Sequence, residues 1–105
     1  MTLKAGVRVF GIRPEIVLAI QMVDAVYREY HRELVVTSCT DGKHSATSLH
    51  HSGGAFDART SMFSKEDQGR LKGRVALALG AEYDVVLESD HLHVEFQPKR
   101  GTTSV

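Results

Sequence analysis

Apolar residues recur with the spacing of one buried helical face along the segment that begins at Pro14. The residues on this face are Ile16, Ala19, Ile20, Val23, Val26, Tyr27 and Tyr30. Pro14 followed by Glu15 is typical of a first helical turn, because proline needs no hydrogen-bonded N–H there and a carboxylate favours the positive end of the helix dipole. We therefore predict a helix that begins at Pro14 and ends near His31 or Arg32.

A second helix is predicted to begin after Ser64. Ser64 and Asp67 have the spacing of a capping box, in which the serine hydroxyl accepts a hydrogen bond from the backbone N–H three residues later. The apolar face of this helix consists of Leu71, Val75, Ala78 and Leu79, and Gly80 is a typical stop signal.

Short β-type runs predict the strands of the domain. The clearest runs are Leu34–Thr37, Ala55–Arg59, Tyr83–Leu87 and Leu92–Phe96, and Val7–Phe10 is a further expected strand. The link between the last two clear runs is short enough for an antiparallel hairpin. The fold class that follows is α+β, with a small antiparallel sheet and two helices.

Length and charge limit the classes of protein that remain. A chain of 105 residues fits a single domain (1–105), whose core we expect at about 7–97 between flexible tails. Its 13 basic and 13 acidic residues balance, which argues against binding nucleic acid or membranes through bulk charge. No apolar run approaches the ~20 residues of a membrane helix, and Met1–Phe10 does not look like a secretory signal. The single cysteine, Cys39, excludes an intrachain disulfide.

Histidines and acids are concentrated in two places. The polar segment Ser38–Gly54 is predicted to be a long loop, which in so small a domain is expected to be functional, and it contains His44, His50 and His51. His91 and His93 begin the last predicted strand, where a separation of two residues places them on one face.

Acids accompany both groups of histidines. Asp57 follows His50 by seven residues, and Glu88 and Asp90 precede His91. Catalytic zinc takes three ligands from His, Asp or Glu and leaves one position for water. Composition and spacing alone leave two readings open, a metal site and ordinary solvated histidines, and solvation is the more common reading for His31 and His51.

Two motifs resemble those of the zinc D-Ala-D-Ala peptidase family, which includes VanX-type dipeptidases, D,D-carboxypeptidases and phage endolysin peptidases. Ser48–Asp57, SLHHSGGAFD, fits the pattern SxHxxGxAxD, and Glu88–His93, ESDHLH, fits the later acidic-plus-HxH element. The resemblance covers about Val36–Phe96 and implies a fold shared with hedgehog signalling domains.

The resemblance implies roles for individual residues. His50, Asp57 and His93 match the three zinc ligands, so one Zn²⁺ per chain is the expected cofactor. His91 matches an active-site histidine that does not bind the metal. Asp90 is the preferred general base and Glu88 the alternative. A reading in which His91 is itself the ligand, three residues after Glu88, stays open.

Substrate binding departs from the family pattern. The family often holds a substrate carboxylate with an arginine in a Thr-Ser-x-x-Arg segment, and here the segment that begins at Thr37 has none. Lys43 and Arg59 are the candidate substitutes, and Ser48 is a candidate hydrogen-bonding residue. Each of these three is also plausible as an ordinary surface or loop residue.

The resemblance implies a zinc peptidase that cuts peptide bonds next to D-amino acids in peptidoglycan stem peptides. A minimal chain without a signal suggests a phage or prophage product, made in a bacterial cytoplasm and acting at the cell wall after phage-mediated release or as a virion component. The alternative is an inactive zinc-binding module of the same fold. A purely structural zinc site is less favoured, because such sites use mainly cysteine.

Overall fold

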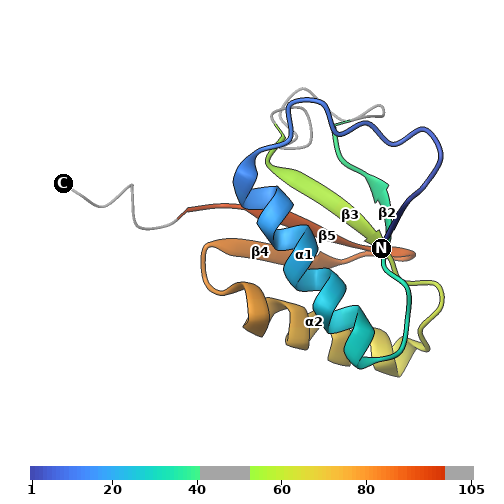
Figure 1. Ribbon diagram of the computed structural model, residues 1–105. Helices are drawn as coiled ribbons and strands as arrows, with labels where there is room; N and C mark the ends of the chain where they lie inside the picture. Colours follow the sequence, from blue (N-terminus) through green and yellow to red (C-terminus); the bar gives the residue numbers. More distant parts are fainter. Residues whose placement is uncertain (41–52, 99–105) are drawn as a thin grey trace.

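The computed structural model describes residues 1–40 and 53–98 of the chain. In this part of the chain, five strands form one sheet in the order β1-β2-β3-β5-β4 (Figure 1). The strands are β1 (Thr2–Leu3), β2 (Val35–Ser38), β3 (Ala55–Arg59), β4 (Tyr83–Leu87) and β5 (His91–Phe96). β1 runs parallel to β2, and every other neighbouring pair is antiparallel. The predicted α+β class is confirmed, with the difference that β1 makes the sheet mixed rather than wholly antiparallel.

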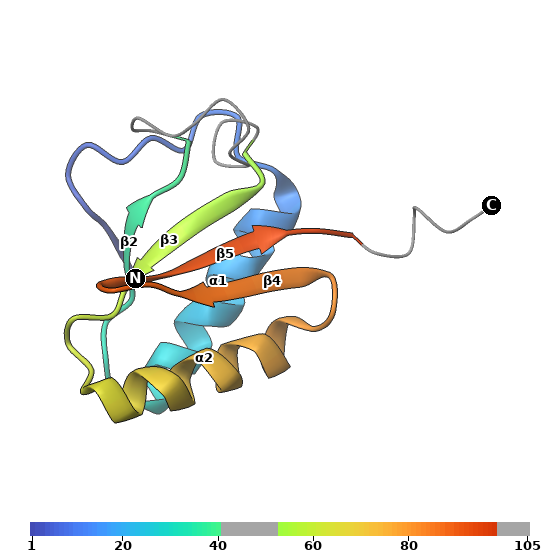
Figure 2. The same ribbon diagram turned by 180° about the vertical axis from the view of Figure 1, so that it is seen from behind.

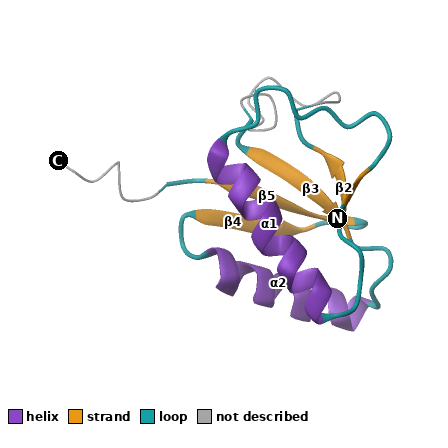
Figure 3. Cartoon of the chain, viewed as in Figure 1, coloured by secondary structure: helices purple, strands orange, loops and turns teal. Residues whose placement is uncertain are grey.

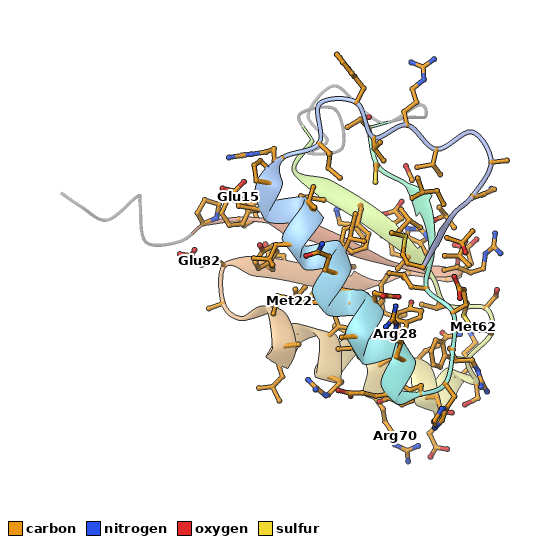
Figure 4. All side chains as sticks on the ribbon, in the orientation of Figure 1. Glu15, Met22, Arg28, Met62, Arg70 and Glu82 are labelled. Carbon is orange, nitrogen blue, oxygen red and sulfur yellow. The ribbon has the colours of Figure 1, made fainter. Side chains whose placement is uncertain are left out.

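The two helices of the described chain lie on the same side of the sheet. α1 (Pro14–Glu29) crosses the sheet diagonally, and α2 (Lys65–Leu79) runs beside β4 (Figure 3). Seen from behind, the opposite face of the sheet is not covered by either helix (Figure 2). Arg70 extends from α2 away from the sheet, on the solvent side of the molecule (Figure 4). The layers therefore leave one sheet face available for polar side chains.

The core lies between the sheet and the helices. The predicted apolar face of α1 is confirmed, since its residues up to Tyr27 are buried. The core cluster also includes Leu34, Val36, Phe56, Ala58, Leu71, Val75, Leu92 and Val94. The Tyr27 and Phe63 rings pack edge to face with their centroids 5.4 Å apart. The Tyr27 hydroxyl donates to the carbonyl oxygen of Arg59 at 2.8 Å, which ties α1 to the end of β3.

The helix ends follow from local sequence. α1 ends two residues earlier than the predicted limit, because His31 adopts a left-handed conformation (φ 57°) that stops the helix. In α2 the expected cap is confirmed: the Asp67 backbone N–H donates to the Ser64 hydroxyl at 3.1 Å. Gly80 ends α2 at a φ of 90°, as predicted.

The expected strand over Val7–Phe10 is wrong. β1 forms earlier, where the Thr2 N–H donates to the Leu34 carbonyl at 2.8 Å and the Lys4 N–H donates to the Val36 carbonyl at 2.9 Å. Residues 7–10 instead belong to the irregular connection between β1 and α1. The β2 strand begins one residue later than predicted, whereas β3 and β4 have the predicted bounds and β5 begins one residue earlier.

Neither helix in the described part of the chain combines the length and apolar character that crossing a lipid bilayer requires.

Candidate metal centre and cleft

The candidate residues gather on the open face of the sheet because side chains alternate along its strands. In β5, Leu92 and Val94 are buried against the helices, so His91, His93 and Glu95 lie on the other face. The β3–β5 register places Asp57 opposite His93 and Arg59 opposite His91. The predicted common face of the two histidines is confirmed, since both contact Asp57.

Asp57 and His93 form the closest pair of candidate ligands. His93 Nδ1 lies 3.0 Å from Asp57 Oδ1, and only 11% of the aspartate side chain and 19% of the histidine side chain are exposed. On the other side of the ring, His93 Nε2 lies 2.7 Å from Glu95 Oε1. The hydrogen bond to Asp57, opposed by burial and reinforced by Glu95, raises the pKa of His93 to about 9. In the absence of metal, this histidine is therefore protonated at neutral pH.

His91 connects the two candidate general bases. Its Nδ1 lies 2.7 Å from Asp90 Oδ1, and its Nε2 lies 2.8 Å from Glu88 Oε1 and 3.7 Å from Asp57 Oδ2. Burial opposes protonation of His91, but the hydrogen bond to Asp90 and the surrounding carboxylates outweigh it, so its pKa is raised. The same hydrogen bond from His91 holds the pKa of Asp90 below its usual range.

A cleft of about 380 Å³ opens beside this group. Asp57, His91 and Asp90 line it together with the cations of Lys4 and Arg59, and Thr37, Ser38 and Ser61 complete the lining. Within residues 1–40 and 53–98, no carboxylate forms an ion pair with Lys4 or Arg59. The cleft therefore combines carboxylate and imidazole groups with two cations.

Sequence reasoning placed Arg59 at this site but missed Lys4, Thr37, Ser38 and Ser61. Lys4 reaches the cleft because β1 pairs with β2. A strand of two residues is too short to be predicted from a local sequence pattern. Ser61 lies two residues after Arg59, the last residue of β3. Extending the strand alternation by two residues would have placed Ser61 on the same face as Arg59.

Gly53 fixes the chain as it enters β3. Its φ is +78°, and a Cβ there would lie 2.1 Å from the Gly11 carbonyl oxygen. The Gly53 carbonyl accepts a hydrogen bond from Arg13 N–H at 3.0 Å, and the Gly54 carbonyl accepts one from Phe96 N–H at 2.9 Å. The two glycines thus hold the start of β3 against the β1–α1 connection and against the end of β5.

Three predicted site residues, His50, Ser48 and Lys43, lie outside the described residues. Among residues 1–40 and 53–98, no group of three or more His, Cys, Asp or Glu side chains has the arrangement of a metal site. Asp57 and His93 are nevertheless an oxygen and a nitrogen donor of the types that zinc binds, held side by side. The donor types of Asp57 and His93 fit zinc, and His50, the third ligand that the resemblance implies, is not among the described residues.

Comparison of the chain with protein-family models and with curated proteins found no match.

Proposed function

We propose that this protein is a zinc peptidase that hydrolyses peptide bonds next to D-amino acids in peptidoglycan stem peptides. The observation that carries the proposal is the pairing of Asp57 with His93 beside a cleft that His91, Asp90 and Arg59 line. The two motifs assign Asp57 and His93 to metal binding and His91 and Asp90 to the active site. Arg59 lies outside both motifs and is a candidate substitute for the family's substrate-binding arginine. The proposed setting is a bacterial cell wall, reached by phage-mediated release or within a virion.

Asp57 and His93 would hold the zinc ion with His50. Bound zinc in such a site supplies a Lewis acid that acidifies water and polarises a carbonyl group. The β3–β5 ladder sets the positions of both ligands, whose side chains are mostly buried. Metal binding would displace the proton between His93 Nδ1 and Asp57 without moving either strand.

Asp90 is the preferred group for proton transfer. It lines the cleft and stands three residues before His93, where the resemblance implies an acid. The hydrogen bond from His91 lowers the pKa of Asp90, which keeps the carboxylate ionised but also makes it a weaker base. His91, whose Nδ1 is held by Asp90, would donate its Nε2–H to the oxyanion that develops on the scissile carbonyl. Glu88 is half exposed and occupies His91 Nε2 in this structure, so it would have to release that nitrogen when substrate binds. It stays the alternative proton acceptor because the resemblance also allows an acid further upstream.

Lys4 and Arg59 would bind an anionic group of the substrate. Both line the cleft that contains Asp57, and an arginine can hold a carboxylate through two parallel hydrogen bonds. Arg59 is well placed for this because its own backbone carbonyl is anchored by Tyr27. A free carboxylate at a peptide terminus is the chemical group that this pair fits.

The test is to incubate the purified protein with muropeptides and with defined stem peptides, and to identify the products by mass spectrometry. Cleavage by the zinc-loaded protein that stops with chelator supports the proposal. Asp90→Asn and Glu88→Gln should each retain zinc, and the variant of the true proton acceptor should lose most of the rate. Zinc-loaded protein that cleaves none of these peptides would contradict the peptidase and favour the inactive zinc-binding module.

A further inference from the structure

Glu95 occupies a position that the proposed mechanism does not use. It lies on the open face of β5, two residues after His93, and its side chain is 23% exposed. Glu95 Oε1 lies 2.7 Å from His93 Nε2, on the side of the ring opposite Asp57. The imidazole is thus held between two carboxylates, one on each nitrogen.

The Glu95 carboxylate is itself fixed by a neighbour. The side-chain amide of Gln97 donates to Glu95 Oε2 at 2.8 Å, and the Gln97 backbone N–H donates to the Glu82 carbonyl at 2.7 Å. The result is a continuous polar row from Asp57 through His93 and Glu95 to Gln97. A carboxylate held in this way can select which imidazole nitrogen carries the proton.

We propose that Glu95 is a positioning residue that accepts the Nε2–H of His93 and so presents Nδ1, beside Asp57, to the metal ion. This inference rests on the proposed zinc site. A ligand histidine whose second nitrogen is bound by a carboxylate has a fixed ring orientation and is a stronger donor. Without Glu95, the ring can rotate and the proton can occupy either nitrogen, so zinc affinity should fall although no zinc ligand is removed.

Three variants test the proposal by chelator competition for zinc. Glu95→Ala should weaken zinc binding about 10- to 100-fold, as loss of such partners does in zinc enzymes. Glu95→Gln retains an oxygen acceptor and should lose clearly less. Asp84→Asn is the matched control. Asp84 lies opposite Glu95 on the neighbouring strand, so this substitution removes one negative charge close to the site without touching Glu95.

The second readout is long-range ¹H–¹⁵N NMR of His93 in protein loaded with ¹¹³Cd²⁺. We expect cadmium coupling at Nδ1, and an Nε2–H that exchanges slowly with solvent in the wild type but rapidly in Glu95→Ala, because Glu95 holds that proton at 2.7 Å. Coupling at Nε2, or zinc affinity in Glu95→Ala no lower than in Asp84→Asn, would overturn the inference while leaving the peptidase proposal standing. Wild-type protein that binds neither metal would overturn both proposals.

Discussion

Substitution of Gly53 by alanine tests how the chain entering β3 is held in place. Two separate features oppose a side chain there: a φ of +78°, and a position for Cβ only 2.1 Å from the Gly11 carbonyl oxygen. A left-handed conformation costs an ordinary residue roughly 1–2 kcal/mol. Relief of the overlap requires the backbone to move, at about 1–3 kcal/mol, and weakens the hydrogen bond from Arg13, worth about 1 kcal/mol.

The sum predicts that Gly53→Ala lowers the free energy of unfolding by about 3–6 kcal/mol, a large share of the stability of a small domain. The assay is urea unfolding of metal-free protein in chelator, followed by circular dichroism, so that zinc does not contribute. Gly6→Ala is the matched control, because Gly6 also has a positive φ but nothing lies within 4 Å of the position of its Cβ. The control should lose about 1–2 kcal/mol. Equal losses in the two variants would refute the close approach to Gly11.

Three further predictions concern the end of α1, the metal-free site and the cleft. His31→Gly should raise the free energy of unfolding by about 0.5–1 kcal/mol, because glycine tolerates the φ of 57°; an unchanged urea midpoint would contradict this. In metal-free protein, pairing with Asp57 raises the pKa of His93 from 6.5 to about 9. The pairing therefore contributes fully to the free energy of unfolding below pH 6.5, and this contribution is lost as the pH rises through about 9, so stability should fall over that range. His93→Gln should flatten this fall in urea titrations, and an equally steep curve would count against the pairing. Arg59→Gln should raise KM about tenfold for stem peptides with a free terminal carboxylate but not for their amides, and an equal effect on both would exclude carboxylate binding.

Elements with strong local patterns were predicted closely from the sequence. The periodicity of α1, the Ser64 cap of α2 and the β-type runs of β3 and β4 depend on neighbouring residues, so local patterns were sufficient for them. The common face of His91 and His93 follows in the same way from alternation along a single strand.

Features that depend on pairing between distant segments were not predictable in this way. β1 forms because Thr2 and Lys4 donate to the carbonyls of Leu34 and Val36, whereas Val7–Phe10 has a comparable pattern but pairs with no strand among residues 1–40 and 53–98. The contact of Asp57 with His93 depends on the β3–β5 register, and Lys4 reaches the cleft only through the parallel β1–β2 pair. The motifs therefore named candidate residues, and the register of the sheet determines which of them meet.

The zinc content of natively purified protein tests the central claim most directly. Elemental analysis should find about one zinc ion per wild-type chain and much less in Asp57→Asn, since Asp57 and His93 are proposed to share the metal with His50. Wild-type protein without stoichiometric zinc, or an Asp57→Asn variant that retains it fully, would contradict the account.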